Sequence, residues 1–308
     1  DYSQQGMYTN LFLPALYTEY VRKDTHYIAN KAPIMQLIYH RALQYVRCAP
    51  AGTQMEFLYQ YLRALLVNFI EYPGGISLKE FAHEFIMGRH LGTCVHSIVV
   101  ARLTVFLFDH MVKNFPEALL GIYGVQTNAE LSSRKEEIST YLYDCGMLHD
   151  IGKLFFLQLF TLPNRQWLSI EEEICEEHAA QGFRLLEQAA STKSYADIAF
   201  GHHRYYDETG GYPREFSREK CSDTVALDLI AVTDFIEYRN ADGNAFREAN
   251  SIEQILEKLN QGRGTRFCSA VVDAVFSAKE EIAIFLSTAR QEAYQRFFEY
   301  SMKSLSID

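Results

Sequence analysis

The sequence predicts an all-helical protein, and three observations support that fold class. Apolar residues recur at steps of three and four positions along most of the chain, which is the spacing of one face of an α-helix. No window alternates strictly between apolar and polar residues for more than a few positions, so half-buried strands are not expected. A content of 48% hydrophobic residues with only seven prolines in 308 residues is typical of a globular protein with a buried core.

We expect residues 1–75 to form a smaller amino-terminal helical unit. Amphipathic helices are predicted around residues 34–46 and 57–69, with a break at the Pro- and Gly-containing stretch 49–52. Pro73-Gly74-Gly75 ends this unit. Its pattern favours packing over chemistry, which leaves a regulatory role or homodimer formation open.

The second unit, residues 76–308, is predicted to begin at a capping box formed by Ser77 and Glu80. The helix that starts there should run to about Val112, with a break near Gly88 or Gly92. A polar connection over 126–135 is interpreted as a surface insertion, or else as a loop that caps a pocket. Further helices are predicted over 138–149, 169–178, 227–236 and 278–303.

Charge and cysteine content narrow the class of protein. A net charge of -10 argues against a duplex nucleic-acid partner, because phosphate affinity needs clustered Lys and Arg. The six cysteines show no C-x-x-C pairing and are interpreted as small buried hydrophobes in a reducing compartment. We expect no membrane-spanning run and no secretory leader, and therefore a cytoplasmic protein. The chain begins at Asp1 rather than Met, which fits a segment of a longer protein.

A histidine and an aspartate stand side by side at the end of an apolar run, as His149-Asp150. The pair offers a neutral nitrogen ligand and a carboxylate that can bridge two cations. Lys153 follows one turn later and adds a positive charge. These are the parts needed for phosphate ester hydrolysis, although a His-Asp pair alone is a weak signal.

The remainder of the chain supplies further ligand types in a fixed order. Asp234 lies in an apolar helix, where an unpaired carboxylate would be costly to bury, and Asp228 in the same run is its competitor as a ligand. The imidazoles suit iron, manganese, zinc or nickel and not calcium. The other candidate ligands are His96 upstream of the pair, and His178, His202 and His203 downstream.

This ordered set, with Gly210-Gly211-Tyr212-Pro213 after the paired histidines, resembles the HD-GYP family of HD-domain metal phosphohydrolases. The resemblance covers roughly residues 85–277 and includes segments near 251–256 and 262–267. It favours His96 over His83, His90 and His110, because His-Ser before an apolar helical run is the family's pattern. It also favours Asp234 over Asp228, whose neighbours are less like the family's.

The resemblance implies a metal-dependent phosphodiesterase that acts on cyclic di-GMP through a hydroxide bridging two metals. Iron or manganese is expected, with zinc or nickel as alternatives. Lys153 would contact the scissile phosphate, and Tyr212 would lie at the pocket wall. Arg204 stands where the family commonly has Glu, and Arg247 is the arginine that could replace the family's altered phosphate-binding region. We treat Asp150 and Lys153 as the catalytic pair.

The resemblance also implies how the metals divide the ligands. His96, His149, Asp150 and Asp234 would surround one metal, and Asp150, His178, His202 and His203 the other. Some relatives hold a third metal through a glutamate one turn before the first histidine, but this chain has Gly92 there. Two metals are therefore expected. Another HD-type nucleotide phosphohydrolase and a weakly active cyclic-dinucleotide-binding module remain alternatives.

Overall fold

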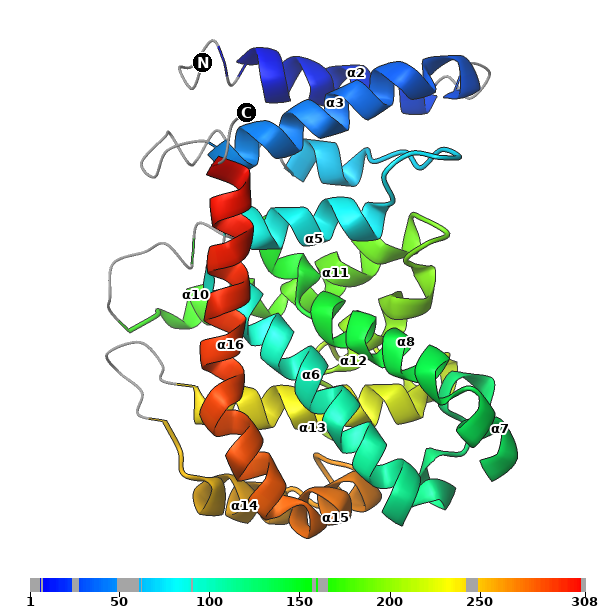
Figure 1. Ribbon diagram of the computed structural model, residues 1–308, viewed down its shortest axis with the longest axis vertical. Coiled ribbons are helices and arrows are strands. Elements are labelled where there is room, and N and C mark those ends of the chain that lie inside the picture. The colour runs from blue at the N-terminus through cyan, green and yellow to red at the C-terminus, as the bar shows by residue number, and fades with distance from the viewer. Residues whose placement is uncertain are drawn as a thin grey trace.

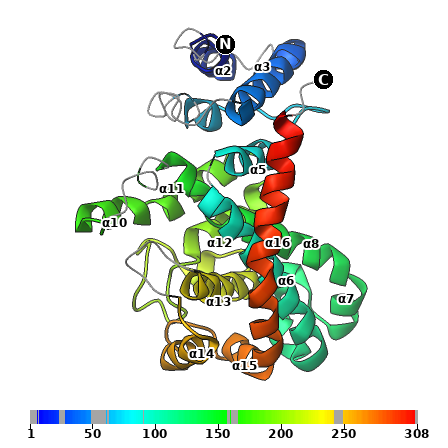
Figure 2. The same cartoon turned by 60° about the vertical axis from the view of Figure 1, so that its left-hand side comes forward.

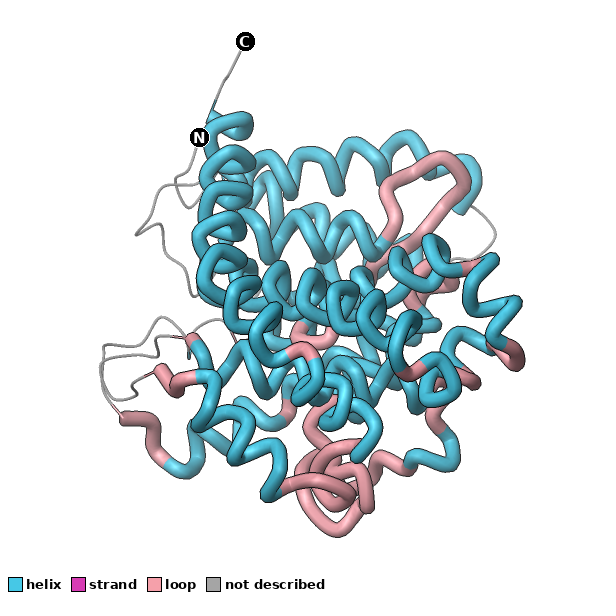
Figure 3. Tube along the Cα trace, turned by 60° about the horizontal axis from the view of Figure 1, so that its bottom comes forward, coloured by secondary structure: helices cyan, strands magenta, loops and turns pink. Residues whose placement is uncertain are grey.

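The computed structural model describes residues 6, 8–23, 28–48, 61, 63–89, 91–156, 159, 166–241 and 249–305. Over these residues the chain is built of helices joined by loops, and no strand forms (Figure 3). Two isolated β-bridges, Arg204 with Gly211 and Arg263 with Phe267, close local loops. The predicted all-helical fold class is confirmed.

The amino-terminal helices form a layer across one end of the molecule (Figure 1). A π-helical turn, Tyr8–Phe12, leads into α2 (Leu13–Lys23), and α3 (Ile28–Cys48) follows. Next to this layer lies α5 (Leu78–Arg89), which packs against α3.

Aromatic side chains hold that layer to the rest of the fold. The ring of Tyr39 on α3 stacks on Phe69 with centroids 4.3 Å apart and lies 5.2 Å from Phe81 on α5. The Tyr39 hydroxyl accepts a hydrogen bond of 2.8 Å from the Ile70 amide. These buried rings join one hydrophobic core that continues across the predicted boundary at residue 75.

The centre of the fold is a crossing of α6 (Leu91–Asn114) and α8 (Lys135–Leu148). Gly146 permits this crossing, because a Cβ there would lie 2.4 Å from Ala101 Cα on α6. The sequence-based expectation that no stretch could span a membrane is wrong by length and composition, since α6 has an 18-residue window with mean hydropathy 1.8. That window is 67% buried against other helices, as in the core helix of a globular protein.

Short helices surround this crossing. The 3₁₀ turn η5 (Ile151–Phe155) follows α8 directly and packs against α11 (His178–Glu187). Helix α13 (Thr224–Asn240) crosses α6. The remaining α-helices are α7 (Asn128–Ser133), α10 (Ser169–Glu176), α12 (Ala196–Gly201), α14 (Ile252–Gln261) and α15 (Ser269–Ser277). Further 3₁₀ turns are η3 (Pro116–Leu119), η4 (Ile122–Gly124), η6 (Lys193–Tyr195) and η7 (Arg218–Lys220).

The last helix, α16 (Lys279–Leu305), runs along one side of the molecule from α15 to the amino-terminal layer (Figures 1 and 2). Near its end, Tyr300 donates a hydrogen bond to Glu84 on α5, and Arg47 on α3 forms an ion pair with the same carboxylate. Near its middle, Arg290 forms an ion pair with Glu237 on α13. The helix is therefore bonded near its end to α5, next to α3, and near its middle to α13.

Local signals in the sequence locate several helix ends. The Ser77 amide donates to Glu80 at 2.8 Å and the Glu80 amide donates to Ser77 at 3.2 Å, which is the predicted capping box. The helix predicted from Ser77 to Val112 corresponds to α5 and α6, and residue 90 between them lies outside the described residues, so the predicted break near Gly88 or Gly92 stays a prediction. The polar connection over 126–135 contains α7, capped by Thr127. The predicted break at 49–52 lies outside the described residues.

We predict that Gly146→Ala destabilises the protein by about 1–3 kcal/mol, because the added methyl group forces α6 and α8 apart. The free energy of unfolding in urea measures this change. Glu136→Ala, on the exposed side of α8, serves as the control and should change stability by less than about 0.5 kcal/mol. Equal stability of the two variants would contradict the close crossing.

Candidate metal centre

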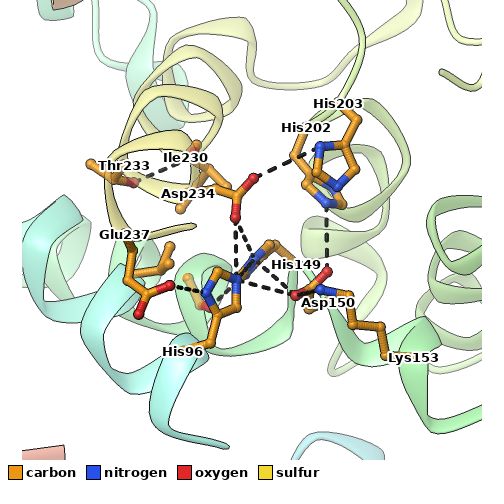
Figure 4. Close-up of polar contacts among 12 residues, drawn as sticks. His96, His149, Asp150, Lys153, His202, His203, Ile230, Thr233, Asp234 and Glu237 are labelled. Carbon is orange, nitrogen blue, oxygen red and sulfur yellow. Dashed lines mark hydrogen bonds and ion pairs between the residues drawn. The ribbon is translucent and has the colours of Figure 1, made fainter. Parts of the chain in front are cut away.

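The seven side chains proposed as metal ligands converge at one place (Figure 4 labels six of them). They arrive from helices that are distant in the sequence. His96 lies within α6 and Asp234 within α13, while the others stand at helix ends. His149 closes α8, Asp150 precedes η5, His178 opens α11, His202 closes α12 and His203 follows it.

One group consists of His96, His149 and Asp234, whose ligand atoms lie within 4.8 Å of one another. The Nε2 atoms of His96 and His149 are 3.1 Å apart. Asp234 Oδ1 lies 3.2 Å from His96 Nε2 and 3.7 Å from His149 Nε2. Asp150 Oδ2 reaches the same group, at 3.2 Å from His96 Nε2.

The second group consists of Asp150, His178, His202 and His203. The other oxygen of Asp150, Oδ1, lies 3.2 Å from His178 Nε2 and 3.8 Å from His202 Nε2. Asp234 Oδ2 lies 3.8 Å from His203 Nδ1, so this carboxylate also reaches toward both groups. Each carboxylate thus directs one oxygen toward each set of imidazoles.

Gly152 brings Asp150 close to α11. A Cβ at this position would lie 1.9 Å from the carbonyl oxygen of His178, so only glycine allows η5 to approach the start of α11. The sequence shows this glycine two residues after Asp150, and the close approach explains why it is needed.

Backbone carbonyls fix the orientation of three imidazoles. Nδ1 of His149 donates to Gly146 O at 2.7 Å, Nδ1 of His178 donates to Cys175 O at 2.6 Å, and Nδ1 of His202 donates to Ala199 O at 2.9 Å. In every case the acceptor lies three residues earlier, on the last turn before the histidine. A proton on Nδ1 leaves the lone pair of Nε2 directed into the site, as metal ligation requires.

His96 is oriented by a carboxylate instead. Its Nδ1 contacts Glu237, which is buried on α13 one turn after Asp234, and Arg290 of α16 pairs with the other oxygen of Glu237. The chain Arg290, Glu237, His96 is a carboxylate–histidine arrangement typical of metal sites. The sequence alone does not reveal this pairing, because no local pattern connects Glu237 with Arg290, which lies 53 residues later.

The donor set fits divalent transition metals. Asp150 is 1% exposed, and its Oδ1 has no hydrogen-bond donor, so a cation would satisfy a buried acceptor. Burial acts to raise the pKa of Asp150, yet Lys153 and neighbouring imidazoles hold this pKa well below its usual range. Burial lowers the pKa of His203 to about 3, which keeps this ring neutral and able to ligate.

The residues that compete with Asp234 and His96 as candidate ligands bond to other partners or lie outside the cluster. Asp228 forms a two-pronged ion pair with Arg218, at 2.7 and 2.9 Å. His110 bonds to Ser277 at 2.6 Å. His83 belongs to neither group of ligand atoms, and His90 lies outside the described residues.

A cavity of about 2110 Å³ opens onto this cluster and includes most of the other candidate residues. Lys153 contacts Asp150 Oδ2, and the Tyr212 ring lies 4.6 Å from the His203 ring. Arg204 also lines the cavity, but it donates to the carbonyls of Gly210 at 2.9 Å and of Glu208, within its own turn. Arg247 lies outside the described residues.

Comparison with known proteins gives a distant relative. Over 156 residues the chain is 26% identical to a cyclic di-GMP phosphodiesterase from Thermotoga maritima. The match covers 50% of this chain and 41% of the relative, so the chain spans less than half of that protein's length. No family model matches the sequence. The likeness supports a relation to phosphodiesterases of this kind, while the HD-GYP resemblance stays a prediction.

We predict that Glu237→Gln weakens metal binding about 10- to 100-fold, because the ring of His96 loses the carboxylate that orients it. Titration calorimetry with Mn²⁺ measures the affinity. Glu281→Gln, at an exposed position on α16, is the matched control and should bind as the unchanged protein does. Unaltered affinity in Glu237→Gln would show that Glu237 does not support His96.

Proposed function

We propose that this chain is a metal-dependent phosphodiesterase that hydrolyses a cyclic dinucleotide, with cyclic di-GMP as the favoured substrate. The observation that carries the proposal is the position of Asp150, whose two oxygens face two separate groups of imidazoles. The distant cyclic di-GMP phosphodiesterase supports the same reaction class.

Two metals, iron or manganese first and zinc or nickel as alternatives, are proposed for the two groups. His96, His149 and Asp234 would hold one, His178, His202 and His203 the other, and Asp150 would join both. Bound metals would supply positive charge to clamp a phosphate and would lower the pKa of a bound water to about 7. The Nδ1–H donors and Glu237 keep the rings aimed, so the protein provides a site that is already organised.

A third metal is not proposed. Gly92 lines the cavity at the position where a further ligand would be needed, and it has no side chain. Glu84, the nearest acidic residue before His96 in the sequence, is bonded to Arg47 and Tyr300 instead.

Lys153 is proposed to bind the scissile phosphate. Its ammonium group contacts Asp150, and this carboxylate raises the lysine's pKa although burial acts to lower it. The lysine therefore stays charged beside the cluster, where it can stabilise the negative charge that grows on the phosphate in the transition state. Tyr212, which packs on the ring of His203, would form the adjoining wall.

The cavity volume of about 2110 Å³ exceeds the roughly 300–1,000 Å³ of common small-ligand sites. A dinucleotide is large enough to use that space. A second candidate function is cyclic-dinucleotide binding with little turnover, and one observation favours it: both Nη atoms of Arg204 donate to carbonyl groups of its own turn.

Asp150→Ala should abolish both metal binding and hydrolysis, because it removes the carboxylate shared by the two groups. Elemental analysis of anaerobically purified protein should give two metals per unchanged chain, and chromatography should show linear dinucleotide or GMP from cyclic di-GMP. Asp273→Ala, outside the cavity, is the control. Full metal occupancy in Asp150→Ala, or three metals per unchanged chain, would overturn this assignment, and metal-loaded protein that binds without product would favour the second function.

Lys153→Ala should keep its metals and lose about 10²- to 10³-fold in kcat, because a phosphate contact is removed while the ligands stay. Steady-state kinetics and metal analysis on the same preparation separate these effects. Lys220→Ala, exposed on η7, should match the unchanged protein in both measurements. Loss of metal from Lys153→Ala would instead assign this lysine to holding Asp150 in place.

A further inference from the structure

Arg266 is a half-buried cation that lines the cavity and has aromatic neighbours rather than carboxylate partners. Its guanidinium carbon lies 4.9 Å from the ring centre of Phe235, 5.0 Å from that of Phe267 and 5.5 Å from that of Tyr205. Among the described residues it forms no ion pair and no side-chain hydrogen bond. Its donors are therefore available to a ligand in the cavity.

The other arginines of the cavity wall differ from Arg266 in this respect. Arg290 is paired with Glu237, and Arg204 donates to carbonyl groups of its own turn. Arg184 and Arg214 are exposed, so water solvates their charges. Within the described part of the cavity, Arg266 is the partly buried arginine whose side chain makes no hydrogen bond or ion pair to the protein, whereas both Nη atoms of Arg204 are bonded.

Two loops hold Arg266 in place. The Tyr206 amide donates to Arg266 O at 3.1 Å, and the Asp207 amide donates to Thr265 O at 2.9 Å. Tyr205, on the first of these loops, is fixed in turn, because Gly210 and Gly211 pack so closely on its ring that a Cβ would approach it within 2.5 and 2.9 Å. The Gly-Gly turn that follows the paired histidines thus helps to position the cation.

The surroundings of Arg266 favour an anionic ligand. Burial lowers the pKa of this guanidinium, and the nearby charge of Arg239 acts in the same direction. Phe235, which packs against it, is adjacent in the sequence to the proposed metal ligand Asp234, and the charge of Asp234 is near enough to act on the pKa of Arg266 in the raising direction. A half-buried cation gains free energy when an anion replaces water beside it, and a guanidinium matches the two free oxygens of a phosphate.

We propose that Arg266 binds the phosphate group of a cyclic dinucleotide that the metal cluster does not hold. This inference rests on the proposed function. A cyclic dinucleotide carries two phosphodiesters, and only one can be cleaved at the cluster at a time. The second would lie on Arg266, with the rings of Tyr205, Phe235 and Phe267 behind the guanidinium.

The test compares a substrate that has two phosphates with one that has a single phosphate. Hydrolysis of cyclic di-GMP and of bis(p-nitrophenyl) phosphate is measured for the unchanged protein, Arg266→Gln, Arg266→Lys and the control Arg296→Gln, at an exposed position of α16 outside the cavity. Equilibrium binding of a phosphorothioate analogue of cyclic di-GMP gives a readout independent of turnover. Metal content and thermal unfolding establish that each variant is folded and loaded.

We expect Arg266→Gln to raise KM and Kd for the dinucleotide about 10- to 100-fold, which is the loss of a charge-assisted hydrogen bond. Its kcat/KM for bis(p-nitrophenyl) phosphate should stay unchanged. Arg266→Lys should recover part of the affinity, because a point charge remains, and Arg296→Gln should behave as the unchanged protein.

The inference is overturned if Arg266→Gln binds the dinucleotide normally or loses both substrates equally. Failure of the proposed function is seen separately, in the unchanged protein. If that protein binds the dinucleotide without cleaving it, the enzymatic proposal fails and the Kd values alone decide the role of Arg266. If it binds no dinucleotide, both proposals are wrong.

Discussion

The burial of the Asp150 carboxylate is the constraint on which the site depends. A carboxylate that is 1% exposed must be neutralised by nearby groups, and Lys153 with four imidazoles surrounds it. Because its two oxygens face different sets of nitrogen atoms, the same residue that needs compensation also connects the two sets.

Helix ends provide the geometry that this cluster requires. His149, His178 and His202 each stand at a terminus, where the chain can change direction and where a carbonyl three residues earlier accepts the Nδ1 proton. Asp234, by contrast, lies inside α13, which crosses α6 near His96. A bundle of short helices around one long central helix can therefore direct ligands inward from several sides without a sheet.

Apolar periodicity predicted the fold class, and the family resemblance selected the candidate ligands that the structure brings together. The packing around α6 and the partners of His96 depend on tertiary structure and could not be predicted in this way. Arg290 reaches Glu237 only through tertiary packing, and Arg204 binds its own turn for reasons of loop geometry that spacing does not reveal. Arg266 has no sequence signal beyond its position in a Gly-rich segment.

The long helix α16 contacts both the amino-terminal layer and the residues behind the cluster. Arg290 and Tyr300 lie ten positions apart on it, or about 15 Å along an ideal helix. One contacts Glu237 behind the ring of His96, and the other contacts Glu84 beside Arg47 of the amino-terminal layer. Helix α16 therefore connects the amino-terminal layer, through these two contacts, with the carboxylate that orients His96.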